Sequence, residues 1–207
     1  MKRKIEQENW IRKDHYEHFK QMDDPFFGIT TNVDCTGTYR KSKEEGISFF
    51  LSYLYYSLKA VNGVEEFKTR IIDDEVFLFD KVHAGPTVFR KDKTYGHALI
   101  RFDEDMGKFM REARKEIARV QAQKGLVYTE QLKNVIHYTT LPWIRFTGIR
   151  QPAVFGGKDS VPKIAFGKLF REGDRMMMPV SIHGHHGLMD GWHVNRHLEL
   201  FEGYLNG

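Results

Sequence analysis

The 207-residue sequence contains a single cysteine, Cys35, and therefore no pair that could form an intrachain disulfide. It has no run of about eighteen apolar residues, the length that a membrane span requires. The charged residues 1–6 are not followed by the apolar stretch of a secretory leader. Zinc-finger spacing and an aromatic-plus-basic RNA-binding pattern are also absent. These absences exclude a disulfide-stabilised scaffold, and they predict a cytoplasmic protein with no membrane or nucleic-acid partner.

Charges of the two signs are nearly balanced, with 32 Lys+Arg against 28 Asp+Glu and a formal net charge of +4. Basic and acidic residues alternate, as in residues 111–116, which is typical of a solvated helix face. The small positive excess suits an anionic small ligand. No linker, repeat or low-complexity segment stands out, and 41% hydrophobic residues suffice for one sizeable core. We therefore expect one domain over residues 1–207.

Hydrophobic periodicity predicts both helices and strands. Apolar residues three or four positions apart predict helices over residues 46–62, 106–120 and 194–205, and residues 14–19 are expected to form a short early helix with aromatic residues. Residues 67–72 and 76–79, joined by Asp73-Asp74, predict a β-hairpin. Further strands are expected over residues 87–89, 97–102, 135–147 and 176–186. Because helices and strands do not alternate regularly, we expect an α/β fold with a mixed sheet.

The most informative segment is His185-His186-Gly187-Leu188-Met189-Asp190-Gly191, close to the end of the sequence. An apolar run precedes it and Trp192-His193-Val194 follows, which predicts a buried strand that ends in a turn and leads into a helix. Catalytic groups are commonly held on a rigid scaffold at such changes of backbone order. Histidine also suits base chemistry near neutral pH. A lone loop histidine is more often only solvated, but the rest of this motif favours a catalytic role.

A histidine base has to be held in one tautomer and one orientation. Asp190 could hold His186 in this way. It stands four residues further along the chain, beyond a turn, so its contact with the imidazole could also be indirect. Arginine is the best bidentate partner for a buried carboxylate, and Arg12 follows Trp10 early in the chain. The run Thr139-Thr140-Leu141-Pro142-Trp143 supplies hydroxyls for the oxyanion of an acyl-transfer intermediate. The spacing alone leaves open whether these three segments meet.

Taken together, these segments resemble the chloramphenicol acetyltransferase family, in its trimeric type with the His-His-x-x-x-Asp-Gly motif. Three blocks match in order and at similar separations: residues 9–15, residues 139–146 and residues 172–194. Shorter segments at residues 60–62, 66–67 and 73–75 also fit, so the likeness covers nearly the whole chain. The histidine motif alone is shared with the acyltransferase core of 2-oxoacid dehydrogenase complexes.

The resemblance implies an acetyl-CoA-dependent O-acetyltransferase that acetylates a hydroxyl of chloramphenicol and so confers antibiotic resistance. It implies a two-layer sandwich that assembles as a homotrimer, with each active site between two subunits. His186 matches the general base that takes the proton of the acceptor hydroxyl, which then attacks acetyl-CoA directly without an acyl-enzyme. Thr139 matches the family serine that hydrogen-bonds the oxyanion, so the hydroxyl is kept and a methyl group is added.

Four further positions acquire supporting roles from the same resemblance. Asp190 and Arg12 match the buried ion pair that supports the histidine, a role that is largely structural. Trp143 and Lys168 match positions near the CoA arm. A cation at position 168 suits the CoA phosphates, whereas Trp143 could equally belong to the core.

The acceptor-binding segments depart from the pattern of the drug-inactivating members. The resemblance places four residues at the acceptor pocket: Phe19 at a tyrosine position, Phe27 at an aromatic position, and Tyr95 and Ile149 at phenylalanine positions. Asp23 replaces a leucine and Pro25 replaces a cysteine. A carboxylate beside an apolar ring costs binding energy unless it is solvated or paired. We therefore expect chloramphenicol to be a poor substrate, and a different small hydroxyl or amine acceptor is the alternative.

Two other functions are compatible with the residues. His183 and His185 share a strand face, and His193 and His197 are four apart on a helix, a spacing that can bind zinc. No cysteine or clear glutamate stands at ligand spacing, so we expect no metal. The third function is that of a catalytically inactive, basic interaction protein, which would not bind CoA and would tolerate His186→Ala.

Overall fold

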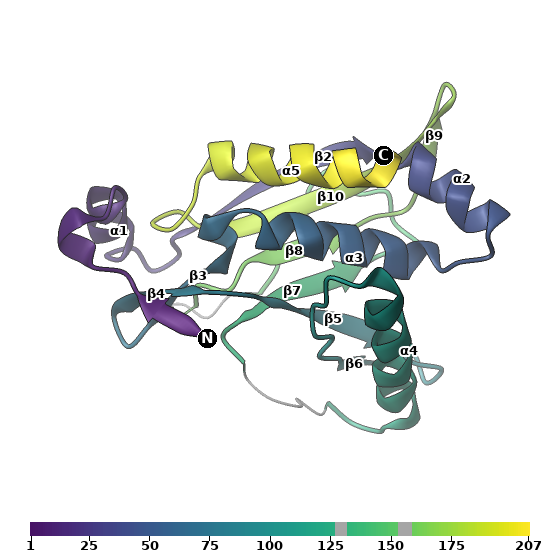
Figure 1. Cartoon of the computed structure of the whole chain (residues 1–207), viewed down its shortest axis with the longest axis horizontal. Helices are drawn as coiled ribbons and strands as arrows, with labels where there is room; N and C mark the ends of the chain where they lie inside the picture. Colours follow the sequence, from purple (N-terminus) through teal and green to yellow (C-terminus); the bar gives the residue numbers. More distant parts are fainter. Residues whose placement is uncertain (127–131, 153–158) are drawn as a thin grey trace.

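The computed structural model describes residues 1–126, 132–152 and 159–207. The chain forms two layers, with helices packed on one face of a mixed β-sheet (Figure 1). The helices on this face include α2 (Thr36–Glu44), α3 (Phe49–Asn62) and α5 (Gly191–Asn206). Helix α4 (Met106–Ala122) packs near β5 (His83–Phe89) and β6 (Tyr95–His97), at one end of the strand order. The expected α/β fold with a mixed sheet is confirmed.

The main sheet contains seven strands and both pairing directions. Strand β7 (Val135–Thr140) pairs in parallel with both of its neighbours, whereas β10 (Arg175–His185), which precedes the turn of the histidine motif, pairs antiparallel with its own. In spatial order the strands are β2 (Phe26–Asp34), β10 (Arg175–His185), β8 (Lys163–Phe166), β7 (Val135–Thr140), β5 (His83–Phe89) and β6 (Tyr95–His97), with β9 (Phe170–Glu172) paired to β10.

A smaller antiparallel sheet supports the N-terminal segment. It consists of β1 (Lys2–Lys4), β4 (Glu75–Phe79) and β3 (Thr69–Ile72), so the expected hairpin is confirmed, with its first residues in the 3-10 helix η2 (Glu65–Lys68). After β1 the chain passes through η1 (Gln7–Asn9) into α1 (Lys13–Phe19). A small buried cluster joins this region to the end of the chain by packing Tyr16 and Leu188 against Ile71 and Val76.

Helix α3 shows how the core is built. Ser48 caps its first turn by accepting a hydrogen bond from the Leu51 amide at 3.3 Å. Leu54, Leu58 and Val61 on its inner side are completely buried. The helix begins at residue 49 rather than at the expected residue 46, because Gly46 adopts a φ of 65°, which is incompatible with a right-handed helix.

Several expected elements have different lengths in the structure. The strand expected over residues 135–147 ends at Thr140, where the chain turns through a hydrogen bond from the Ile144 amide to the Leu141 carbonyl. Of residues 97–102, only His97 belongs to a strand, and Ile100 forms an isolated bridge with Ala84. Helix α2 and strands β2, β8 and β9 were not expected. None of the helices in the described ranges is long and apolar enough to cross a membrane.

The two faces of the main sheet differ in chemistry. Toward the helices, Tyr138, Ile164 and Ile182 occupy one row across β7, β8 and β10 and are almost fully buried. Because successive residues of a strand point to opposite faces, their neighbours point away from the helices. The register places these neighbours in two rows: His137, Lys163, His183 and Gly28 in one, and Thr139, Ala165, Ser181 and Thr30 in the other. We call this second side of the sheet the open face.

Candidate active site

The histidine motif occupies the expected strand, turn and helix. Strand β10 ends at His185, the turn begins at His186, and Asp190 is the N-cap of α5. The His186 amide donates a hydrogen bond of 2.8 Å to the Pro25 carbonyl, just before β2. The turn is therefore fixed to the neighbouring strand as well as to its own.

Two aromatic rings fix the orientation of the His186 side chain. The Phe19 ring stacks on the imidazole with centroids 4.3 Å apart and planes within 4°. The Phe27 ring lies 4.7 Å away at a tilt of 42°. Within the described residues, Nδ1 of His186 is buried and has no hydrogen-bond partner. Nε2 is therefore the nitrogen that could exchange a proton with a substrate.

Arg12 holds the backbone of this turn and also binds Asp190. One guanidinium nitrogen, Nη1, donates to Oδ2 of Asp190 at 2.8 Å. The other, Nη2, donates to the His186 carbonyl at 3.0 Å, and Nε lies 3.4 Å from the Gly187 carbonyl. Asp190 therefore acts on His186 indirectly, through Arg12 and the backbone. We call these two side chains the Arg12–Asp190 clamp.

The Asp190 carboxylate is held in its charged form. Partial burial raises the pKa of this carboxylate. The hydrogen bond from Arg12, the neighbouring His193 and the Trp192 amide together have the larger, opposite effect, so the pKa is lowered to about 2. Oδ1 of Asp190 accepts from the Trp192 amide at 3.0 Å and lies 2.9 Å from Nδ1 of His193. Nε2 of His193 lies 3.4 Å from Oε1 of Glu66 on η2. His193 therefore links the Arg12–Asp190 clamp to the 3-10 helix that precedes β3 of the small sheet. His193 and Glu66 were not among the expected site residues, although the capping-box position of His193 was a usable signal.

Thr139 lies at the opposite end of the sheet from His186 within one chain. The register sets Thr139 level with Ala165 and Ser181, and β10 continues four residues beyond Ser181 to His185. At about 3.3 Å per residue this is a rise of about 13 Å, with two strand spacings of about 4.8 Å across the sheet in addition. One chain therefore does not bring Thr139 and His186 together.

Trp143 and Lys168 lie beside each other at the Thr139 end. The Lys168 amide donates to the Ile144 carbonyl at 2.8 Å, next to Trp143. Lys168 is exposed, and the Trp143 side chain is 59% exposed with its ring edge against Phe89 at 5.1 Å. In the isolated chain Trp143 is thus not a core residue.

The expected acceptor residues fall into separate places. Phe19 and Phe27 surround His186, whereas Tyr95 is half-exposed on the edge strand β6. Asp23 is exposed, and the buried Pro25 supplies the carbonyl that binds the His186 amide. A hollow of about 550 Å³ on the open face is lined in part by Lys163, His183, Phe26, Asp24 and Arg150. Ile149 does not line this hollow, and its backbone hydrogen-bonds with His183, which does. Asp24, rather than Asp23, therefore faces this hollow.

The four histidines considered as metal ligands do not converge. His183 lies on the open face, His185 is buried behind the turn, His193 caps α5, and His197 is buried between Phe67 and Phe201. Within the described ranges no group of three or more His, Cys, Asp or Glu side chains could hold a metal ion.

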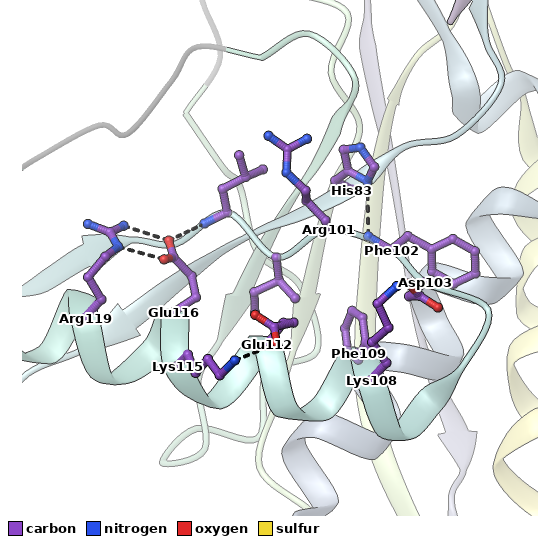
Figure 2. Close-up of a pocket in the computed structure, with 12 residues that line it drawn as sticks. His83, Arg101, Phe102, Asp103, Lys108, Phe109, Glu112, Lys115, Glu116 and Arg119 are labelled. Atoms are coloured by element: carbon purple, nitrogen blue, oxygen red, sulfur yellow. Dashed lines mark hydrogen bonds and ion pairs between the residues drawn. The ribbon is translucent and has the colours of Figure 1, made fainter.

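A second hollow, of about 530 Å³, lies between α4 and residues 99–103 (Figure 2). Several of its charged side chains pair with one another, as in Lys115 with Glu112 at 2.8 Å and Arg119 with Glu116 at 2.7 Å. Glu116 also accepts from the Leu99 amide at 3.0 Å. None of the expected site residues lines this hollow, so it is not part of the candidate active site.

Comparison with known proteins agrees with this arrangement. The family model described as chloramphenicol acetyltransferase matches residues 2–202. A chloramphenicol acetyltransferase of Proteus mirabilis is 26% identical over 203 residues, which cover 98% of this chain and 94% of the relative. Chloramphenicol acetyltransferase 2 of Escherichia coli is 28% identical, with 96% and 94% covered.

Solved structures give the same result for the fold. A chloramphenicol acetyltransferase superposes with a TM-score of 0.92 at 29% identity, covering 99% of this chain and 100% of the other. A probable dihydrolipoamide acetyltransferase from Listeria monocytogenes has a TM-score of 0.68 at 15% identity, with 93% and 88% covered. At that identity the second likeness concerns the fold alone.

Proposed function

Because the chain belongs to the chloramphenicol acetyltransferase family, we propose that it transfers the acetyl group of acetyl-CoA to a hydroxyl of chloramphenicol. The enzyme class, an acyltransferase, follows from the family. The observation that carries the proposal is the geometry of His186, which two aromatic rings and the Arg12–Asp190 clamp hold at a turn.

In the proposed reaction, Nε2 of His186 takes the proton of the acceptor hydroxyl. The hydroxyl oxygen attacks the thioester carbonyl, and the oxyanion of the tetrahedral intermediate accepts a hydrogen bond from the Thr139 hydroxyl. The intermediate collapses with cleavage of the C–S bond. The CoA thiolate that leaves then takes up the proton that His186 received from the hydroxyl. Lys168 and Trp143 beside Thr139 are suited to the CoA arm, because a cation binds phosphate and an indole covers an apolar chain.

We further propose that the active site forms between subunits of a homotrimer. The base and the oxyanion donor act on atoms bonded to the same carbon, each from about 3 Å. The separation of more than about 13 Å within one chain supports a site in which Thr139 and His186 come from different copies.

The direct test is thiol release from acetyl-CoA in the presence of chloramphenicol, with mass spectrometry of the product. We expect stoichiometric release of CoA and a product that has gained one acetyl group. Omission of chloramphenicol controls for hydrolysis of the thioester. Thiol release with other hydroxyl compounds but not with chloramphenicol would contradict the proposed acceptor while leaving the acetyl transfer intact.

A further inference from the structure

Two pairs of hydroxyl groups connect helix α3 to the strand that carries Thr139. The phenol oxygen of Tyr53 and Oγ1 of Thr140 lie 3.3 Å apart, and Oγ of Ser57 and the phenol oxygen of Tyr138 lie 3.2 Å apart. In each pair either oxygen can donate the hydrogen bond. Tyr138 and Thr140 are the neighbours of Thr139 on β7, so the two hydrogen bonds stand on either side of it along the strand. We call Tyr53–Thr140 and Ser57–Tyr138 the hydroxyl pairs.

The spacing of the helix and that of the strand match at the hydroxyl pairs. Tyr53 and Ser57 are four residues apart, so they lie on one side of α3 and are separated by about 6 Å along its axis. Tyr138 and Thr140 point to the same face of the sheet, about 6.6 Å apart. A shift of β7 by one residue would turn both hydroxyls away from α3 and break both hydrogen bonds. Pairing with β5 and β8 fixes β7 within the sheet, and the hydroxyl pairs fix it against the helix layer.

The surroundings of the hydroxyl pairs are apolar. The Tyr53 ring packs against Phe166 with centroids 4.8 Å apart, and the Tyr138 ring stacks on Phe166 at 5.9 Å. Tyr53, Tyr138 and Ser57 are 5%, 1% and 0% exposed. Burial raises the pKa of both phenols, so they remain neutral hydroxyl groups. Because a buried hydroxyl without a partner is costly, movement of β7 away from α3 is opposed at both points.

Thr139 itself points to the open face, on the other side of β7 from the hydroxyl pairs. A β-branched side chain has few allowed χ1 rotamers, so the direction of the Thr139 hydroxyl follows the orientation of its backbone. An oxyanion donor has to lie about 2.7–3.1 Å from the oxygen that becomes charged. A displacement of about 1 Å near a reacting group can cost about a hundredfold in rate. A small rotation of β7 would therefore weaken the hydrogen bond to the oxyanion.

We propose that Tyr53 and Ser57 are positioning residues for the oxyanion donor: through Thr140 and Tyr138 they hold the β7 backbone so that Thr139 presents its hydroxyl to the reacting carbonyl. This inference rests on the proposed role of Thr139 in acetyl transfer. Both residues act from the helix side of the sheet and through their partners on β7. Their loss should therefore lower kcat, as the loss of an interaction made in the transition state does, with little effect on KM.

The test compares two buried tyrosines of the same helix. Tyr53→Phe removes one hydroxyl of a pair and keeps the ring. Tyr55→Phe is the matched control, because the Tyr55 hydroxyl donates to the Glu104 carbonyl at 2.6 Å and not to β7. Steady-state thiol release gives kcat and KM for each variant. We expect Tyr53→Phe to lower kcat about tenfold with little change in either KM, and Tyr55→Phe to stay within about twofold of the wild type.

The same substitution in Thr139→Ala separates positioning from a merely structural role. Once the Thr139 hydroxyl is absent its direction no longer matters, so Tyr53→Phe should cause no further loss of kcat in this background. Ser57→Ala should behave in the same way at the other hydroxyl pair, and it tests the proposal if Tyr53→Phe does not fold. Thermal unfolding and light scattering verify that each variant is folded and assembled like the wild type. An unchanged kcat, a change confined to KM, or the same fractional loss with and without the Thr139 hydroxyl would overturn the proposal.

A measurement without turnover keeps this inference separate from the proposed function. In protein with ¹³C-labelled threonine methyl groups, the Thr139 signal is the one that Thr139→Ser removes. The three-bond couplings of this methyl carbon give the χ1 populations. Tyr53→Phe should lower the population of the main rotamer, and Tyr55→Phe should leave it unchanged.

The two readouts distinguish the possible failures. Wild-type protein that releases no thiol contradicts the proposed function, and the methyl couplings then decide the inference: an unaltered Thr139 rotamer in Tyr53→Phe overturns it. In active protein the kinetic comparison decides. A large effect of Thr139→Ala together with an unchanged kcat in Tyr53→Phe contradicts only the positioning role and leaves the proposed acetyl transfer standing.

Discussion

At the scale of single residues, His186 combines a fixed orientation with one available nitrogen. The stacked Phe19 ring and the tilted Phe27 ring restrict its rotation, and Nδ1 is buried. We expect His186→Ala to lower acetyl transfer by about a hundredfold to ten-thousandfold, the usual contribution of a general base. Steady-state thiol release measures this, and His15→Ala on the exposed side of α1 is the matched control. Turnover close to that of the wild type in His186→Ala would rule out the proposed base.

Thr139 offers a second test at this scale, because its role depends on a hydroxyl and not on its shape. Thr139→Ala should lower kcat by about a hundredfold, or about 2.7 kcal/mol in activation free energy, with a smaller change in KM. Thr139→Ser keeps the hydroxyl and should retain most of the activity. The kinetic constants for both substrates measure the effect, and a change confined to KM would show that Thr139 contributes to binding and not to the oxyanion.

The site residues that could be predicted are those whose chemistry stands in a local pattern. His186, Arg12 and Asp190 belong to blocks in which the resemblance predicts a base and its supporting ion pair, and the structure brings these three residues together. Lys163 and Asp159 carry no such signal, since a lysine four residues after an aspartate suggests a solvated helix face. In the structure these two side chains form a buried ion pair, because Lys163 belongs to β8, which lies between β7 and β10. The local sequence does not indicate this position in the sheet.

At the scale of secondary-structure elements, the Arg12–Asp190 clamp joins the segment before α1, the turn of the histidine motif and the first turn of α5. Asp190→Asn removes the charge but keeps a good N-cap acceptor. We expect a loss of about 2 kcal/mol in the free energy of unfolding at pH 7, the scale for an unsatisfied buried hydrogen-bonding group. Urea unfolding measures this loss, and activity should fall less than in His186→Ala.

The pH dependence of this difference provides the check on its cause. The pKa of Asp190 is lowered from 3.8 to about 2 in the folded state, so its charge stabilises the fold above about pH 4. That contribution is lost as the pH falls from about 4 to 2, where the folded carboxylate also becomes protonated. Wild type and Asp190→Asn should therefore converge in stability over this range. A difference that stays constant with pH would assign the effect to side-chain shape and not to charge.

Helix α5 also contains a buried histidine that the proposed mechanism does not use. His197 lies between Phe67 and Phe201, and burial lowers its pKa to about 3; within the described residues neither ring nitrogen has a hydrogen-bond partner. Between about pH 6.5 and 3 the unfolded chain binds a proton that the folded chain does not, so stability falls as the pH falls.

We expect His197→Leu to be at least as stable as the wild type at pH 7 and to lose less stability between pH 6.5 and 4. The loss is reduced and not abolished, because burial also lowers the pKa of His185 to about 4. Thermal unfolding across this pH range measures the effect. An unchanged slope of stability against pH would show that His197 is not a source of acid sensitivity.

Elements with a continuous apolar stripe could be predicted from the sequence, and the others could not. Helix α4 follows the expected pattern over its whole length, whereas α2 buries only Thr38 and Ser42 and so has no apolar periodicity to detect. Strand β2 is mostly half-buried, and β8 has only four residues. The strand expected over residues 135–147 was too long, because an apolar run continues past Thr140 into the turn at Leu141 and Pro142.

At the scale of the whole molecule, the sheet separates the two halves of the proposed chemistry. His186 and the Arg12–Asp190 clamp lie where β10 ends, and Thr139, Trp143 and Lys168 lie where the interior strands β7 and β8 end. Within a single copy, the proposed base is therefore out of reach of the proposed oxyanion donor. Closed assembly of identical copies would place the two ends of different subunits opposite each other.

Mixing of two inactive variants tests this arrangement. In the proposed homotrimer every site draws on two copies, so His186→Ala and Thr139→Ala each remove one half of every site. After unfolding and joint refolding, mixed trimers contain sites that receive His186 and Thr139 from unmodified partners. We expect thiol release to reappear in the mixture, well above the sum of the separately refolded variants. A double variant carrying both changes, mixed in the same way with either single variant, should restore nothing, since no site then regains both groups. Light scattering should give a mass near three chains of 24.3 kDa. A fully active monomer, or a mixture no more active than its parts, would show that Thr139 and His186 do not act across an interface.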